Sequence, residues 1–385
     1  MAYVVKRARK SGGFSYLVRY HGPDGKTHSR QFAKKVDADR FANASEVAKH
    51  SGSWIDPGRG RILFAEWVEK WKPSQVHLRP SSRARDESYL DTHIVPRFGN
   101  VPLAKIQNAD IRAWIAELSA LGLAPATVGK AKQIVSKILQ AAVDDRRIPT
   151  NPADRIPVPR IEREEMRYLD PAQVSHLADT IDQRYRALVL LGAYGGLRLG
   201  EMFGLRWGRV DLLRRRVQVA EVCVEVKGEL TFGPPKTKAG VRTVPIPSVV
   251  VDELAALTAP NPDPKALVFT SPQGAPLRAG QFRQRIWYPA IKEADLEGLR
   301  LHDLRHTAVA LWIAAGGNPK EIAVRAGHAS VVTVLDRYGH LYPEAEDRLS
   351  DALDAMAGAV TPTYEIAPRS TRPHRRRDSA GTGRS

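Results

Sequence analysis

The sequence predicts a mainly α-helical protein with small antiparallel β-sheets, arranged in three domains and followed by a tail. Three observations support this prediction. Hydrophobic residues recur with helical spacing over most of the chain after residue 62. Short alternating stretches border glycine- or proline-containing turns within residues 14–32 and 214–247. Two linker-like segments rich in glycine or proline, SGSWIDPGRGR and RIPTNPADRIPVPRIEREEM, separate the three domains, residues 1–58, 62–160 and 165–350.

The bulk composition is that of a globular protein. The chain has 385 residues, of which 43% are hydrophobic and 26% charged, and this length accommodates two or three domains. No apolar run approaches the roughly 20 residues that cross a bilayer, and the first residues lack the apolar stretch of a signal peptide. The single cysteine, Cys223, argues against a disulfide or a cysteine-based zinc site. We therefore expect a cytoplasmic protein with no membrane partner.

The net charge of +17 indicates a polyanionic partner. Duplex DNA, RNA and an acidic membrane surface all satisfy this requirement, and charge alone does not separate them. Binding that neutralises phosphates should weaken steeply as salt increases.

The N-terminal domain, residues 1–58, is small and basic. Its stretch FSYLVRYHGPDGKTHSRQF predicts two strands joined by a turn, and KKVDADRFANASEVAKH predicts a following helix. Such a unit could place one face of its sheet in a DNA groove, or it could be a structural cap. The pattern supports both interpretations equally.

Residues 62–160 are predicted to be entirely helical. Asn108 is a plausible N-cap, and the second helix is expected to end at Pro96 and Gly99. The last helix carries a hydrophobic stripe with three lysines beside it, which are either solvent-exposed or phosphate-binding: Lys130, Lys132 and Lys137. The four predicted helices are residues 62–72, 81–99, 108–122 and 126–145.

Residues 165–350 are predicted to form a mainly helical domain with a small inserted sheet. Asp170 is expected to cap a helix that begins at Pro171, and a buried helix should stop at Gly195 and Gly196. Strands are expected on both sides of the turn PPKTKAG. The tail, residues 360–385, is rich in Arg, Pro, Ser and Thr and is expected to be disordered and basic.

A set of cationic and hydrogen-bonding residues suggests chemistry at a phosphodiester. His302 and Arg305 are three residues apart and so share a helical face, and Arg198 follows a Gly-Gly turn upstream. His328 lies in a tight turn, and Tyr338 follows ten residues later. Arginines bind phosphate oxygens in a bidentate manner and stay charged, so they can stabilise the charge that builds up on these oxygens during transfer.

Tyr338 is the candidate nucleophile, and Tyr342 is its alternative. A tyrosine hydroxyl titrates near ~10, so neighbouring arginines are expected to favour the phenolate while a histidine removes the proton. Lys236 or Lys238 on the turn could protonate a leaving 5′ oxygen. Neither a two-metal acidic cluster nor a phosphate-binding glycine loop is present in the sequence. We therefore expect no metal and no cofactor.

The succession GLRLGE, PKTKAGVRTVPIP, HDLRH, AGHAS and LDRYGHL resembles the tyrosine recombinases, in particular phage-type integrases. The resemblance is strongest over residues 168–345 and is weakest at the N-terminus. It implies an N-terminal β-sheet domain that binds arm-type DNA sites, a helical SAM-like core-binding domain and a mixed α/β catalytic domain.

The resemblance also implies roles for individual residues. Glu201 would be the acid that orders the site, and Lys236 matches the lysine of the hairpin better than Lys238 does. Ala326 departs from the leucine usual at this position, which should affect packing more than chemistry. The implied catalytic residues are Arg198, Lys236, His302, Arg305, His328 and the nucleophile Tyr338.

The implied reaction is site-specific recombination through a 3′-phosphotyrosine intermediate. It would integrate or excise a phage or mobile element at attachment sites in double-stranded DNA. The chain would be a monomer in solution and a homotetramer on DNA, assisted by a DNA-bending factor and an excisionase, in the nucleoid. The segment after Tyr338 would pack on a neighbouring protomer.

Three alternatives remain open from the sequence. A type IB topoisomerase would use a similar set of residues to nick and reseal one duplex. A DNA-binding regulator could share the helical domains without catalysis, although the complete set of residues argues against it. A chromosome-dimer resolving recombinase would usually lack the N-terminal sheet.

Overall fold

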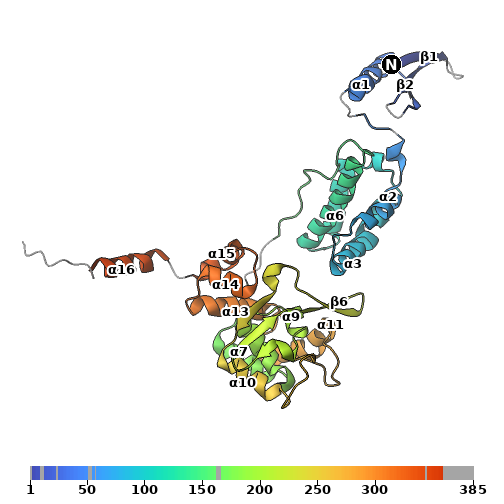
Figure 1. Ribbon diagram of the computed structural model, residues 1–385. Coiled ribbons are helices and arrows are strands. Elements are labelled where there is room, and N and C mark those ends of the chain that lie inside the picture. Colours follow the sequence, from blue (N-terminus) through green and yellow to red (C-terminus); the bar gives the residue numbers. More distant parts are fainter. Residues whose placement is uncertain are drawn as a thin grey trace, which may run out of the picture.

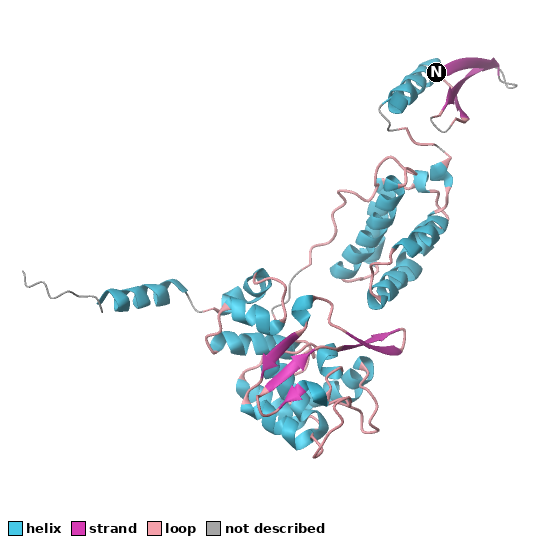
Figure 2. Cartoon of the chain, in the orientation of Figure 1, coloured by secondary structure: helices cyan, strands magenta, loops and turns pink. Residues whose placement is uncertain are grey.

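The structure is a computed structural model in which helices predominate and strands form small sheets (Figure 2). The fold class expected from the sequence is therefore confirmed. No helix among the described residues is both long and apolar enough to cross a membrane. The tail beyond residue 358, including the segment expected to be disordered, lies outside the described residues. The structure describes residues 2–8, 13–22, 25–50, 54–56, 58–161, 166–342 and 345–358, without the side chains of 345–349.

The N-terminal unit is a three-stranded antiparallel sheet with one helix packed against it (Figure 1). The strands β1 (Tyr3–Ala8), β2 (Phe14–His21) and β3 (Thr27–Phe32) lie in that order, and α1 (Lys35–His50) covers one face. The sequence predicts only β2 and β3, so that prediction is incomplete. In β1 the two valines are adjacent and the outer residues are exposed, so hydrophobic alternation is missing. Its pairing with β2 defines it as a strand.

The second unit is helical and has its own hydrophobic core. The indole N–H of Trp67 donates to the carbonyl of Ile138 over 3.0 Å, which joins the first helix of the unit to the last. Trp114 and Phe98 pack edge to face in the same core. The helices are α2 (Phe64–Trp71), α3 (Pro80–Tyr89), α4 (Val95–Phe98), α5 (Asn108–Ala120) and α6 (Pro125–Asp144).

Two helix boundaries in this unit differ from the prediction. The N-cap of α5 is Gln107, whose backbone N–H donates to Asp110 over 2.8 Å, so Asn108 is already helical. The second predicted helix continues past Pro96 and ends at Phe98 with Gly99 as its C-cap, so the end expected at Gly99 is confirmed and the one at Pro96 is not. A π-helical turn over Leu90–Ile94 leads without a break into α4, and Pro96 lies just after this turn, in the first turn of α4.

The third unit packs its helices around the buried helix α8 (Arg186–Gly195). Its neighbours are α7 (Pro171–Thr180), α10 (Ser248–Leu257) and α13 (Asp303–Ala314). Asp170 caps α7 by accepting from the backbone of Gln173, as the sequence predicts. The remaining helices are α9 (Leu199–Phe203), α11 (Ala279–Phe282), α12 (Tyr288–Glu293), α14 (Pro319–Ala326) and α15 (Val332–Tyr338).

The strands of this unit form a three-stranded sheet and a separate hairpin. The sheet has the order β4 (Val210–Asp211), β5 (Arg216–Val219) and β8 (Arg242–Pro245). The hairpin pairs β6 (Val222–Val226) with β7 (Glu229–Gly233). Strands therefore do flank the turn PPKTKAG, but β7 and β8 do not pair with each other. The turn joins two different sheets.

The lysine turn is also bound by the helical unit. The guanidinium of Arg79, just before α3, donates to the carbonyls of Pro234 and Pro235 over 3.3 and 3.0 Å. Lys227 in the β6–β7 turn pairs with Glu87 at 2.8 Å. At the other end of the chain, α16 (Ala345–Gly358) extends away from the third unit (Figure 1), and its Leu353 and Met356 are exposed.

Candidate active site

Arg198 stands at the start of α9, directly after a turn that requires glycine. Gly196 ends α8 with φ +64°, and a Cβ on it would lie 2.5 Å from the Trp312 ring. The backbone N–H and the guanidinium of Arg198 both donate to Glu201, over 2.9 and 2.7 Å. Burial raises the pKa of Glu201, but hydrogen bonds from Arg242 and Arg198 outweigh this effect and keep the pKa below its usual value. Glu201 is therefore ionised and orients Arg198.

Arg305 lies in the first turn of α13 and makes hydrogen bonds to two other turns of the site. Its buried guanidinium donates to the Gly196 carbonyl over 2.6 Å, to the Ala326 carbonyl, and to Nε2 of His328 over 3.1 Å. Burial, followed by the charge of Arg198, lowers the pKa of Arg305 to about 9. Arg305 therefore stays charged at neutral pH.

His328 follows Gly327, which ends α14 with φ +64°. Because Arg305 donates to Nε2 of His328, the proton of the neutral ring belongs on Nδ1. This Nδ1 is buried and has no hydrogen-bond partner within the described parts of the chain. Burial and the charge of Arg305 lower the pKa of His328 to about 4, so it is a neutral donor near pH 7. Arg198 also donates to the Gly327 carbonyl over 3.2 Å, which places Arg198 beside His328.

His302 precedes α13 and shares the site with Arg305, as their spacing predicts. Burial and then the charge of Arg305 lower the pKa of His302. Its ring lies perpendicular to that of His306, with ring centroids 5.0 Å apart.

Tyr338 is the last residue of α15 and is only 2% exposed. Its hydroxyl lies 2.5 Å from Nδ1 of His306. Burial raises the pKa of Tyr338 more than the charges of Arg305 and Arg337 lower it. The two arginines act in the expected direction, but the expected net preference for the phenolate is wrong here because burial outweighs them. Burial and then His302 lower the pKa of His306 to about 4, so a neutral imidazole faces the phenol.

The alternative tyrosine and the two lysines of the turn have different surroundings. The Tyr342 hydroxyl is buried, and no described residue bonds it. Burial raises the pKa of Tyr342. Lys236 and Lys238 are both exposed on the turn between β7 and β8. They are thus accessible to a ligand, while the carbonyls just before them are held by Arg79.

The three lysines of α6 are not equivalent. Lys130 lies 3.6 Å from buried Asp86 and donates to Gln133 over 3.1 Å. Burial is the main cause that lowers the pKa of Lys130. Lys132 is half-buried and Lys137 is exposed. Lys130 therefore holds α6 to α3, and Lys137 faces solvent.

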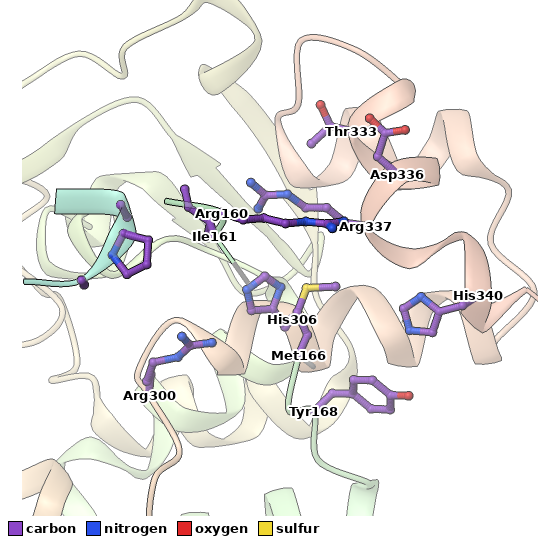
Figure 3. A pocket seen from close by; sticks show the side chains of 13 residues that line it. Arg160, Ile161, Met166, Tyr168, Arg300, His306, Thr333, Asp336, Arg337 and His340 are labelled. Atoms are coloured by element: carbon purple, nitrogen blue, oxygen red, sulfur yellow. The ribbon is translucent and has the colours of Figure 1, made fainter. Parts of the chain in front are cut away.

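A cavity of about 1380 Å³ opens between the start of α6 and α15, where Asp336 and Arg337 of α15 line it (Figure 3). Three arginines line it, from the linker, from the loop before α13 and from α15: Arg160, Arg300, which pairs with Asp303 at 3.0 Å, and Arg337, together with the acid Asp336. His306 also lines it, so one side of the imidazole faces the cavity while Nδ1 faces Tyr338. The site therefore opens towards a space suited to a polyanion.

Two residues of the site, His306 and Arg242, are missing from the sequence-based prediction. His306 directly follows Arg305 in HDLRH, but its bond to Tyr338 spans 32 residues and has no local signal. Arg242 lies in β8, where it could pass for an exposed strand residue. No group of three or more His, Cys, Asp or Glu is placed to hold a metal ion in the described ranges.

Comparison with known proteins agrees with this geometry. Residues 167–345 match the phage integrase family, and residues 63–119 match the phage integrase N-terminal SAM-like domain. The putative prophage phiRv2 integrase of Mycobacterium tuberculosis is 29% identical over 91% of this chain and 95% of its own length. The ICEBs1 integrase of Bacillus subtilis is 28% identical over 73% of this chain and 80% of its own length.

The chain belongs to the phage integrase family. Solved structures of integrases share its fold. The Tn1549 transposon integrase, in complex with transposon right end DNA, superimposes with a TM-score of 0.65 at 21% identity, covering 77% of this chain and all of that one. A lambda integrase dimer bound to a core site gives a TM-score of 0.54 at 15% identity, covering 86% and 93%. The matched residues 167–345 contain the four segments that meet in this site.

Proposed function

We infer that this chain is a site-specific DNA recombinase that cuts and rejoins strands through a 3′-phosphotyrosine. The observation that carries this function is the junction at Arg305, whose guanidinium contacts both the turn before Arg198 and His328. Fixed cations around one point are what a phosphodiester in transfer requires. Tyr338, on the helix that follows His328, supplies the oxygen.

The reaction is an exchange of ester bonds. The Tyr338 oxygen attacks the scissile phosphorus, the bond to the 5′ oxygen breaks, and the 3′ phosphate stays on the tyrosine. Arg198 and Arg305 bind the non-bridging oxygens, assisted by His302, while His328 holds the guanidinium of Arg305 through Nε2. Lys236 gives a proton to the leaving 5′ oxygen. Attack by a 5′ hydroxyl of a partner strand reverses these steps, so the energy of the bond is retained.

His306 is the base that we assign to Tyr338. With the ring proton assigned to Nε2, the neutral ring accepts from the phenol over 2.5 Å, and its other side faces the cavity, where the proton can leave. A positioned base contributes about 10²–10⁴-fold. The pKa of about 4 keeps the His306 ring neutral from pH 6 to pH 8 but makes it a weak base, so it accepts the phenol proton only as the oxygen bonds to phosphorus.

Replacing His306 with alanine should slow cleavage by about 100-fold, a loss typical of a missing general base. The substitution His306→Asn tests the role more sharply, because its amide can accept a hydrogen bond near the position of Nδ1 but cannot take up the proton. Single-turnover cleavage at saturating DNA is the measurement, and wild type should be nearly flat from pH 6 to pH 8. Full activity of His306→Asn would show that His306 only orients the phenol.

The partner is double-stranded DNA, bound by all three units. The charge of +17 and the cavity walls around Arg160 and Arg337 support this partner. We propose a monomer in solution and a homotetramer on DNA, in which the exposed Leu353 and Met356 of α16 pack on a neighbouring protomer. A DNA-bending factor and an excisionase would set the direction of recombination. The relatives named for a prophage and for ICEBs1 suggest a phage or another mobile element.

The N-terminal sheet is proposed to bind arm-type DNA with the face that α1 leaves open. Val18 and Tyr20 point to α1, so Arg19 between them points to the opposite face. Arg19 is exposed and pairs in register with Tyr3 and Ser29. This face therefore presents an arginine flanked by small and aromatic groups.

Arg19→Ala should weaken DNA binding and lower the slope of log affinity against log salt by about 1. The measurement is the affinity of the full chain, at several salt concentrations, for a duplex that it enriches from a random library. Lys49→Ala is the matched control, because Lys49 lies on α1 and pairs with Glu46 at 2.6 Å. Equal slopes for the two variants would argue against this face.

The function itself is tested by covalent trapping. The full chain is incubated without metal with a nicked duplex that carries the core sequence it enriches. A protein–DNA adduct that survives denaturation, joined through a peptide containing Tyr338, is the expected result. A chain that binds this duplex and never forms an adduct would be a DNA-binding regulator. Relaxation of supercoiled DNA without exchange between two sites would indicate a topoisomerase.

A further inference from the structure

We propose that Arg242 is a positioning residue that keeps Arg198 available to the scissile phosphate. Both arginines bind the carboxylate of Glu201, so Arg242 satisfies part of the charge that Arg198 would otherwise neutralise alone. This inference rests on the proposed recombinase function and assigns Arg242 no contact with DNA.

Arg242 is buried and its guanidinium makes four hydrogen bonds. Its Nη1 and Nη2 donate to the two oxygens of Glu201 over 3.1 and 2.9 Å. Its Nε donates to the Arg325 carbonyl over 2.8 Å, and Nη1 also donates to the Gly240 carbonyl over 3.1 Å. Only 5% of its side chain is accessible, so it is far less open to a ligand than Arg198, at 37%.

The charges explain why two arginines are needed around one acid. Glu201 is buried and ionised, and it faces Arg198 on one side and Arg242 on the other. Because Arg242 takes both oxygens in a bidentate fork, Arg198 needs only one further side-chain bond to the acid. The pair of arginines and the acid together carry a net positive charge. Because Arg198 is the more accessible of the two arginines, it is the one that can present this charge to a phosphate.

Arg242 also connects the lysine turn to the histidine turn. The Gly240 carbonyl belongs to the short helical turn after Lys236, and the Arg325 carbonyl lies just before Gly327. The packing here is tight, because a Cβ on Gly327 would lie 3.0 Å from Nη1 of Arg242. One buried fork thus sets the distance between the turn that carries the lysine and the turn that carries His328.

Removing Arg242 should therefore change the site in a specific way. Glu201 would keep its charge and have Arg198 as its remaining arginine. The single side-chain bond from Arg198 would then become a bidentate pair, which turns its guanidinium away from the phosphate. Arg242→Met is then expected to slow cleavage by about 100-fold, similar to loss of one donor to a phosphate, with DNA affinity changed less than about threefold, because Arg242 is buried.

The decisive measurement is a double-mutant comparison by single-turnover cleavage of the enriched nicked duplex. Glu201→Gln removes the charge that would capture Arg198. The pair Arg242→Met and Glu201→Gln should thus cleave about tenfold faster than Arg242→Met alone. Arg186→Met is the matched control, since Arg186 in the same unit binds Glu253 and Asp179 away from the site. Its rate, corrected for the folded fraction, should equal that of wild type.

Two results would overturn the role of Arg242. One is a rate for Arg242→Met that falls only in proportion to the folded fraction. The other is a further loss of rate when Glu201→Gln is added, as expected if the network only supports the fold. Absence of an adduct with wild type on a duplex that it binds would instead overturn the recombinase function itself.

Discussion

Tyr338→Phe is expected to abolish the covalent protein–DNA adduct, with a loss of at least about 10⁴-fold, because removal of a nucleophile leaves only the binding contribution. The phenyl ring should keep its place in the cluster around α15, which includes Val309 and Val334. The substitution removes one hydrogen bond, to His306, worth about 1 kcal/mol of stability. Gel analysis after denaturation and a melting curve of the same sample separate lost chemistry from lost folding.

Tyr342→Phe is the matched control for this experiment. Its hydroxyl is buried without a described partner, so removing it should leave both folding and adduct formation nearly unchanged. An adduct that persists in Tyr338→Phe and disappears in Tyr342→Phe would move the nucleophile to Tyr342. The assignment of His306 as the base would then fail as well.

Arg305→Ala should produce the second largest loss, about 10²–10³-fold in single-turnover cleavage, as for other buried donors to a developing charge. The substitution removes a cation from the phosphate and also leaves the Gly196 and Ala326 carbonyls without their donor. A drop in stability is expected together with the loss of rate, because buried carbonyls need partners.

Arg305→Lys distinguishes these two contributions. Lysine keeps the charge but lacks the planar fork that reaches both Gly196 and His328. Binding of the enriched duplex should persist in both variants, while cleavage should recover only partly in Arg305→Lys. Cleavage by Arg305→Ala at nearly the wild-type rate would remove Arg305 from the set of phosphate ligands.

Much of the fold and part of the candidate site can be predicted from local patterns in the sequence. Helical spacing predicts the cores of the helical and mixed units, and Asp170 with Pro171 marks the start of α7. The separation of three residues in HDLRH places His302 and Arg305 on one face. Such features are local, because they depend on backbone geometry within a turn or two. The order of the motifs was also sufficient for the family resemblance.

Features that depend on contacts between distant segments can be seen only in the tertiary structure. The pairing of β5 with β8, with Val217 opposite Val244, places Arg242 behind Glu201. The burial of Tyr338 against His306 reverses the expected pKa shift of the phenol. Neither result follows from spacing, because desolvation and long-range hydrogen bonds arise only when the chain packs. The sequence therefore shows the types and the order of the site residues. The protonation states of these residues, and the hydrogen bonds from Arg242 and His306 that hold them in place, follow only from the tertiary structure.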